Sequence, residues 1–314
     1  MDIFGGLWLE NIVVQDKYFD LQLELFQKKY IQGIQIRVAH PSFTPLLTIF
    51  SLPKIFKKIP DDCKLFFHFG AENVGVDFGE NFDECAVIAR RSGQHNWSEW
   101  NKQTTEFGIE VARAAREKVP KNFPLGDVHP GYGEHITDYV ALDKIIRTLR
   151  EFPKDIAIEN VPPVVDRYFY KEKTGEMNFW SRNRYWGFGG IPDDMDLLLK
   201  DLGDGWRCLI DFSHLWVMKN QAEEEIPEVP RALREIEYAV RSYLSLPHWP
   251  ICHFSGVPQA GMLVDEHEFF EIDRLVPAIR EAIASMEAVC LEIPYKSLEV
   301  AEKAIGCFRE AYSL

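Results

Sequence analysis

The chain has 314 residues, of which 46% are hydrophobic and 27% charged, the mix of an ordinary globular protein. Its net charge of −14 argues against a surface that coats nucleic acid along its whole length, but not against a local basic patch. The sequence does not open with a basic segment and a long apolar run, no stretch approaches the roughly 20 apolar residues of a membrane span, and the cysteines are scattered, so we expect a reduced, cytoplasmic protein without a membrane partner.

Short runs of apolar, β-branched or aromatic residues recur along the chain and predict eight strands. In chain order they are 3–9, 33–40, 64–70, 123–131, 155–163, 207–214, 250–256 and 288–295. Apolar residues at three- and four-residue spacing predict helices at 97–119, 138–152, 229–244 and 271–286, whereas prolines blur the pattern after the first two strands. Strands that alternate with helices pair in parallel, and eight of them close a ring. The predicted fold is therefore α/β, a (β/α)8 TIM barrel with a single domain over residues 1–314.

The main irregularity is a long, aromatic-rich connection between strands five and six, residues 161–205, which we expect to lie over the C-terminal mouth of the barrel. Between 167 and 186, Lys and Arg outnumber acidic residues and are interleaved with aromatic side chains, a mix that can neutralise phosphates and stack bases. The segment fits a DNA contact, and it fits a lid or a dimer contact equally well. The candidate substrate-binding residues are Arg182 and Arg184 in this segment and Arg37 at the end of strand two.

Histidines and carboxylates follow six consecutive predicted strands, at the barrel end where active sites lie. A single strand-end histidine is most often structural, but many buried ionisable side chains gathered without a counter-charge would be strongly destabilising. Bound cations are the simplest explanation, and nitrogen and oxygen donors without thiolate suit Zn, with Mn or Fe as alternatives. The candidate metal ligands are His68, His129, Glu159, Asp211, His214, His253, Asp265, His267 and Glu292.

The order of these residues resembles the endonuclease IV family, within the xylose isomerase-like TIM-barrel superfamily. The similar motifs are HFG, HPG, IEN, IDFSH, CHFSG, VDEH and LEIP, and they extend from strand three to strand eight. The resemblance implies up to three zinc ions. The first would be held by His68 and His129, the second by Asp211, His253 and Glu292 with Glu159 as the bridge between the two, and the third by His214, Asp265 and His267.

The sequence departs from the family in three places. The motif at 265–273, DEHEFFEID, lacks the usual Arg and Gly; the first strand lacks its small, polar and His-containing pattern; and the aromatic segment has no counterpart that we can match. These differences leave all nine candidate ligands in place, but they mean that the substrate need not be the one the family acts on.

The leading functional prediction is a metal-dependent phosphodiester hydrolase similar to endonuclease IV, acting at abasic sites in DNA, with Glu159 as the catalytic residue that orients water or takes its proton. The alternative is a metal-dependent isomerase or epimerase of a small sugar or sugar phosphate, with Glu159 and Glu292 as a proton-transferring pair. A weaker alternative is a non-catalytic metal-binding paralogue. Three bound ions would favour the first function, and one or two the second.

Overall fold

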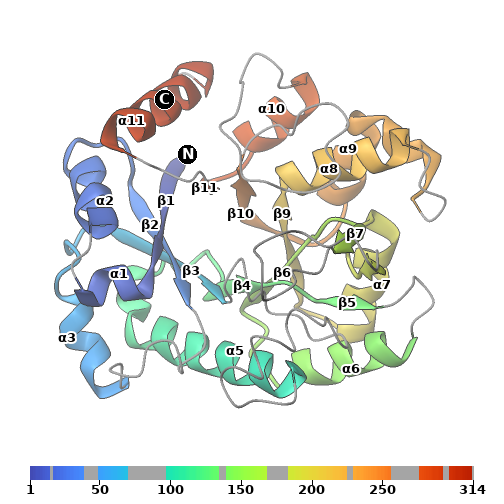
Figure 1. The fold of residues 1–314 in the computed structure, drawn as a ribbon, viewed down its shortest axis with the longest axis horizontal. Helices are drawn as coiled ribbons and strands as arrows, with labels where there is room; N and C mark the ends of the chain where they lie inside the picture. The colour runs from blue at the N-terminus through green and yellow to red at the C-terminus, as the bar shows by residue number, and fades with distance from the viewer. Residues whose placement is uncertain are drawn as a thin grey trace, which may run out of the picture.

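A computed structural model of the protein shows eight parallel strands closed into a barrel (Figure 1). It describes residues 1–14, 17–38, 49–69, 97–133, 139–167, 183–224, 229–255, 276–292 and 297–312. The barrel strands are β1 (Asp2–Trp8), β2 (Gly33–Val38), β3 (Lys64–Phe69), β4 (Gly126–Val128), β6 (Ile156–Glu159), β9 (Arg207–Asp211), β10 (His248–Phe254) and β11 (Ala288–Leu291). Each pairs with the next along the chain, and β1 closes the ring against β11. The predicted (β/α)8 barrel is confirmed.

Helices surround the strands on the outside of the ring (Figure 1). They are α1 (Leu9–Val14), α2 (Lys17–Gln27), α3 (Leu52–Phe56), α5 (Trp97–Ala114), α6 (Tyr139–Leu149), α7 (Pro192–Leu202), α8 (Phe212–Glu223), α9 (Ile236–Leu244), α10 (Pro277–Ala284) and α11 (Leu298–Tyr312). Short 3-10 turns lie at Ile49–Ser51, Arg116–Lys118 and Arg231–Arg234. The spacing of apolar residues predicts α5, α6, α9 and α10, and it misses α1, α2, α3, α7, α8 and α11. In α8 the pattern is weak because residues are buried on most sides of the helix.

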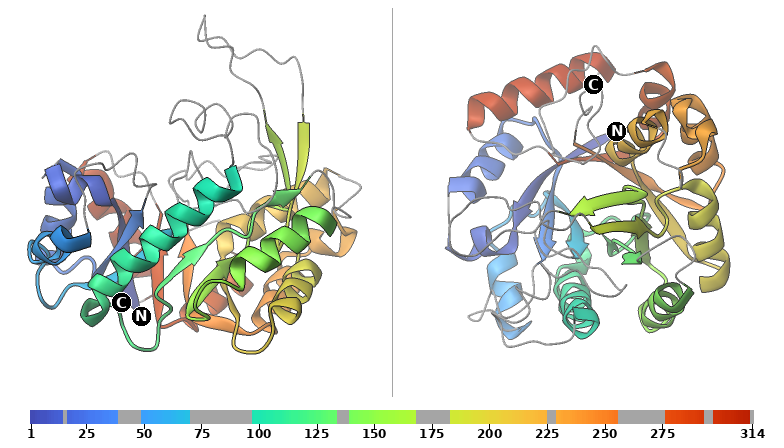
Figure 2. Two further views of the ribbon diagram at one scale, coloured as in Figure 1. Left: turned by 90° about the horizontal axis from the view of Figure 1, so that it is seen from below. Right: turned by 45° about the vertical axis from the view of Figure 1, so that its right-hand side comes forward.

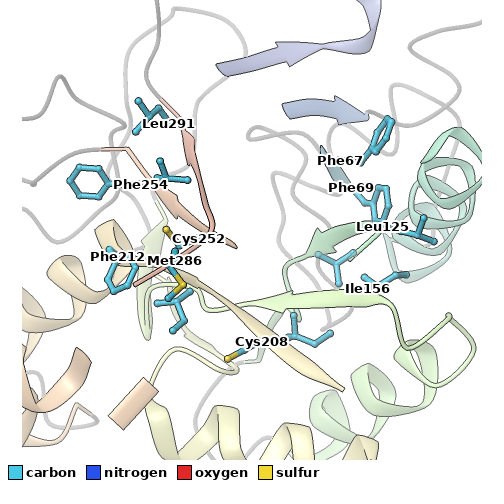
Figure 3. Packing of buried hydrophobic residues seen from close by; sticks show 14 of the residues in the cluster. Phe67, Phe69, Leu125, Ile156, Cys208, Phe212, Cys252, Phe254, Met286 and Leu291 are labelled. Carbon is cyan, nitrogen blue, oxygen red and sulfur yellow. The ribbon is translucent and has the colours of Figure 1, made fainter. Parts of the chain in front are cut away.

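The outer faces of the strands pack against the helices and form the larger apolar core, part of which is shown in Figure 3. Phe67 and Phe69 on β3, and Cys252 and Phe254 on β10, belong to this layer. Successive side chains of a strand point to opposite faces, so the residues between them point into the barrel.

The inside of the barrel is closed by a second, smaller apolar cluster that includes Phe66, Ala157, Leu209, Ile251 and Cys290. Each of these residues stands two positions before a candidate ligand on the same strand or just beyond its end. Since the side-chain period of a strand is two, each ligand candidate lies on the inner face directly above an apolar residue. The five candidates placed in this way are His68, Glu159, Asp211, His253 and Glu292.

A small antiparallel sheet stands at one end of the barrel, with β7 (Val164–Arg167) and β8 (Asn183–Gly187) as a hairpin and β5 (Tyr132–Gly133) beside β8. Figure 2 (left) shows the hairpin rising at the end opposite to the two chain termini. The amino end of β1 lies with those termini, so the hairpin rises from the carboxyl end of the strands.

The base of the hairpin is tied to neighbouring helices. Trp186 is buried and donates its Nε1–H to Asp194 Oδ2 of α7 at 2.6 Å, and the Tyr243 hydroxyl of α9 donates to the Gly189 carbonyl at 2.8 Å. The described part of 161–205 thus consists of the hairpin and α7. Residues 168–182 lie outside the described residues, and the role of the whole segment as a cover of the mouth stays a prediction.

Within the described part of the chain, none of the helices has the length and apolar character that crossing a bilayer requires.

Candidate metal centre

The carboxyl ends of the barrel strands bring seven of the nine candidate ligands to one mouth. His68, Glu159, Asp211 and His253 lie in strands β3, β6, β9 and β10, whereas His129 and Glu292 directly follow β4 and β11. His214 is not at a strand end, since α8 begins at Phe212 and His214 lies in its first turn. All of these side chains are buried except that of His129, which is 21% exposed. The seven residues are His68, His129, Glu159, Asp211, His214, His253 and Glu292.

Glu159 lies at the centre of the group, and its two carboxylate oxygens face different imidazoles. Oε1 lies 3.1 Å from His253 Nδ1 and 3.9 Å from His214 Nδ1. Oε2 lies 3.4 Å from His129 Nε2 and 3.6 Å from His68 Nδ1, and it has no hydrogen-bond partner among the described residues. The carboxylate of Glu159 therefore lies between two pairs of imidazole rings, one pair at each oxygen.

Asp211 and His214 are held by the start of α8. The Asp211 carboxylate caps this helix by accepting the backbone N–H of Ser213 at 2.6 Å and that of His214 at 3.2 Å. His214 Nδ1 lies 2.6 Å from the Asn160 carbonyl, which can only accept, so Nδ1 carries the proton. The other ring nitrogen, Nε2, lies 3.7 Å from Asp211 Oδ2 and keeps a lone pair that could bind a metal.

Glu292, His253, Gln35 and Arg37 form the opposite side of the mouth. Glu292 Oε1 accepts from Gln35 Nε2 at 3.0 Å and from Arg37 Nη2 at 2.9 Å. His253 Nδ1 lies 3.5 Å from the same oxygen, and Gln35 Nε2 lies 3.0 Å from His253 Nε2. Arg37, predicted as a substrate-binding residue, thus reaches the mouth and pairs with a candidate ligand.

One carboxyl group of the site was missed by the sequence analysis. Asp127 on β4 is fully buried, and its Oδ2 lies 2.5 Å from His68 Nδ1, while Oδ1 lies 3.8 Å from His253 Nε2 and has no hydrogen-bond partner among the described residues. The sequence signal that could have identified Asp127 is its distance of two residues from His129. Asp127 stands two residues before His129, so a strand that turns His129 to the mouth also turns Asp127 inward.

Burial and mutual contact shift the pKa values of these groups in opposite directions. Burial lowers the pKa of His68 to about 4, against the opposing charge of Glu159. Burial also raises the pKa of Asp127 well above its usual range, against the effect of His253. Burial alone would raise the pKa of Glu159, but His253 and His129 outweigh it and hold that pKa well below its usual range.

His253 lies among three of these carboxyl groups. Burial alone would lower the pKa of His253, but Glu159, Glu292 and Asp127 raise it well above its ordinary value. The carboxylates around His253 thus favour a positive charge at this position. A bound cation would supply that charge and favour the neutral imidazole, the form that binds metals.

The donor set and the charge of the mouth fit divalent metal ions. Asp127, Glu159, Asp211 and Glu292 bring four carboxyl groups into one buried space, where Arg37 supplies one positive charge. Three overlapping groups of side chains have ligand atoms within 4.8 Å of one another. They are His68 with Asp127, Glu159 and His253; Glu159 with Asp211 and His214; and Asp211 with His253 and Glu292.

No known family model matches the sequence, and no curated protein matches it. Several solved structures are similar along the chain, including the three that follow. One is a D-psicose 3-epimerase in the presence of D-fructose, with a TM-score of 0.50, 12% identity and 100% of both chains covered. Another is the TTHB071 protein from Thermus thermophilus soaked with ZnCl2, with a TM-score of 0.50, 13% identity, and 100% of this chain and 98% of that chain covered. The third is AsfvAP:AG, with a TM-score of 0.53, 11% identity, and 99% and 98% covered.

At such low identity, the likeness concerns the fold, and it extends over nearly the whole of every chain. The fold is that of the xylose isomerase-like TIM barrels. In this xylose isomerase-like barrel, the buried His, Asp and Glu groups form a possible metal site at the end of the barrel where active sites lie.

The remaining predicted site residues cannot be placed at the mouth of the barrel. Asp265, His267 and Arg182 lie outside the described residues, and Arg184 lies in β8 with its side chain outside the described part. The trio of His214 with Asp265 and His267 therefore stays a prediction. Within the described residues, His214 instead groups with Glu159 and Asp211.

Proposed function

We propose that the protein is a divalent-metal-dependent phosphodiester hydrolase similar to endonuclease IV, with zinc as the expected metal. The observation that carries the proposal is the position of Glu159. Its Oε1 faces His253 and His214, whereas its Oε2 faces His129 and His68. A carboxylate with imidazole rings beside each oxygen, each ring able to bind a metal through its unprotonated nitrogen, is suited to bridge two ions, and pairs of ions suit phosphodiester hydrolysis better than single ions do.

The division of the residues among the ions follows the resemblance. His68 and His129 would hold one ion, and Asp211, His253 and Glu292 another, with Glu159 shared between the two. His214, Asp265 and His267 would hold a third. When bound, such ions activate water and neutralise the departing oxygen. Glu159 would orient that water or take its proton at the oxygen that faces it.

An abasic site in duplex DNA is the proposed substrate. The resemblance of the ligand order supports it, and so does Arg37, whose guanidinium lies in the mouth and matches the geometry of a phosphate. The cations and aromatic residues between 167 and 186 would add contacts with the DNA backbone and bases, Arg182 and Arg184 among them.

The test is incubation of zinc-loaded protein with a duplex that contains one abasic site, beside an intact duplex and a chelated sample. We expect incision of the abasic strand that chelation abolishes and zinc restores. Equal cleavage of both duplexes would contradict the abasic substrate, and no chelator-sensitive cleavage of either would contradict the hydrolase.

A sugar isomerase or epimerase is the second candidate. His253 Nδ1 lies 3.1 Å from Glu159 Oε1 and 3.5 Å from Glu292 Oε1, so two carboxylates approach one position from different strands. Such a pair could remove and return a proton on opposite faces of a small sugar. One or two ions per chain, together with chelator-sensitive exchange of a ketose proton with solvent deuterium, would favour this function over hydrolysis.

A further inference from the structure

Asp127 stands between two histidines that face opposite oxygens of Glu159. In the barrel register it is the direct partner of His68, and its Oδ2 lies 2.5 Å from His68 Nδ1. Its Oδ1 lies 3.8 Å from Nε2 of His253. His68 approaches Oε2 of Glu159 and His253 approaches Oε1, so Asp127 lies beside both halves of the proposed bridge.

The short contact with His68 decides between two roles for Asp127. Donors that share a tetrahedral zinc ion at roughly 2.0–2.1 Å lie about 3.3 Å apart. The 2.5 Å separation of Asp127 Oδ2 and His68 Nδ1 is too short for two ligands of one ion. It is also below the ~2.7–2.9 Å of a charge-assisted N–H···O hydrogen bond, so the imidazole and the carboxyl group meet as hydrogen-bond partners.

The direction of this hydrogen bond fixes the chemistry of His68. Bound cations favour the ionised form of Asp127, and its carboxylate then accepts from His68, so Nδ1 of His68 carries the proton and Nε2 keeps the lone pair that would bind a metal. A carboxylate behind a ligating histidine also makes the imidazole a stronger donor. The contact with Asp127 is therefore an arrangement that prepares His68 to bind through Nε2.

We infer that Asp127 is a positioning residue that holds His68 in the Nδ1–H form and so leaves Nε2 of His68 free to bind a metal. The inference rests on the metal site of the proposed function and adds to it a residue outside the ligand set. Loss of the Asp127 charge would weaken metal binding about 10- to 100-fold.

Two variants of Asp127 and one control variant distinguish a role in positioning His68 from a role in packing alone. Asp127→Asn keeps the shape and an oxygen that can accept from His68, but it removes the charge, whereas Asp127→Ala removes both. Asp194→Asn is the matched control, because Asp194 is a partly buried carboxylate that accepts an N–H from Trp186 outside the site. Zinc affinity is measured by competition with a chromogenic chelator, stability of the chelated protein by denaturant unfolding, and the His68 tautomer by ¹⁵N NMR of labelled imidazoles.

We expect wild type and Asp194→Asn to bind zinc equally, Asp127→Asn to bind it about 10- to 100-fold more weakly, and Asp127→Ala more weakly still. Chelated Asp127→Asn should be at least as stable as chelated wild type, because a buried charge near other carboxylates has been removed. The Nδ1–H signal of His68 should survive in Asp127→Asn and be lost in Asp127→Ala.

Two results would overturn the inference alone: wild-type zinc affinity in Asp127→Asn, or a chelated Asp127→Asn that loses stability in proportion to its loss of affinity. A wild-type protein that binds no zinc would overturn the proposed function, and this inference with it. The zinc affinity of the wild-type protein thus shows whether the inference alone has failed or the proposed function as well.

Discussion

Arg37 and Glu292 form a buried ion pair across the mouth of the barrel, with 2.9 Å between Arg37 Nη2 and Glu292 Oε1. Each side chain is less than a tenth exposed. Arg37 comes from β2 and Glu292 follows β11, so the pair spans β1, which lies between them in the barrel. A carboxylate that already has a cation beside it can share its charge between that cation and a metal.

The first prediction concerns the removal of this cation. Arg37→Met should lower the free energy of unfolding of the chelated protein by about 3 kcal/mol, since Glu292 would stay buried without its guanidinium. Saturating zinc should recover much of that loss by supplying another positive charge. Denaturant unfolding with and without zinc measures both effects.

Lys64→Met provides the control for this measurement. Lys64 pairs with Asp2 at 2.5 Å, but its side chain is 45% exposed, so its loss should cost less than about 1 kcal/mol and show no dependence on zinc. An Arg37→Met protein with the same loss of stability at every zinc concentration would contradict the link between Arg37 and metal binding.

The second prediction concerns Glu159. Glu159→Gln should fold but bind fewer zinc ions per chain, because an amide cannot bridge two ions with two charged oxygens. Incision of the abasic duplex should fall by about 10²- to 10⁴-fold, the usual effect of losing a general base. Metal analysis after dialysis measures the first effect, and strand cleavage at saturating zinc the second. Full stoichiometry with full activity would remove Glu159 from both roles.

The third prediction separates the two roles of Asp211, which caps α8 and is a candidate ligand. Asn caps helices as well as Asp does, so Asp211→Asn should unfold like wild type in chelator, whereas Asp211→Ala should lose about 1 kcal/mol. In zinc, both variants should gain less stabilisation than wild type does. Unfolding curves of the three proteins in both conditions check this, and an Asp211→Asn protein that zinc stabilises as much as wild type would count against Asp211 as a ligand.

Much of the site is predictable from the sequence of single strands, because side chains of a strand point to the same face at every second residue. Phe66 precedes His68, and Leu209 precedes Asp211, by one step on the inner face. An apolar run that ends on a polar residue is thus enough to place a side chain at the mouth once the barrel is assumed. The strand order then follows from the chain order.

The contacts that the sequence analysis missed depend on register between strands. Asp127 meets His68 because β4 and β3 align these residues as direct partners, and no pattern within either strand fixes that alignment. Gln35 likewise reaches His253 and Glu292 across the barrel. The position of His214 in a helix also depends on a local feature that strand periodicity does not predict. Asp211 ends β9 and caps α8, so the helix begins at the next residue.

The fourth prediction concerns pH and a carboxyl group outside the site. Burial raises the pKa of Asp194 to about 6, although the hydrogen bond from Trp186 opposes the shift. An unfolded aspartate titrates near ~3.9, so the folded protein binds this proton more tightly than the unfolded chain does. Protonation therefore favours the folded state, and the stability associated with Asp194 should fall as pH rises from about 4 to about 6.

Asp194→Asn tests this sign directly, because Asn keeps an oxygen for Trp186 Nε1 but cannot ionise. The variant should be more stable than wild type at pH 7, and the difference should shrink as pH falls through the pKa of about 6 and vanish near pH 4. Denaturant unfolding of both proteins in chelator, across this pH range, gives the difference without a contribution from metal binding. A constant difference, or one that grows towards acid pH, would show that Asp194 is charged in the folded protein throughout, with the hydrogen bond from Trp186 outweighing burial.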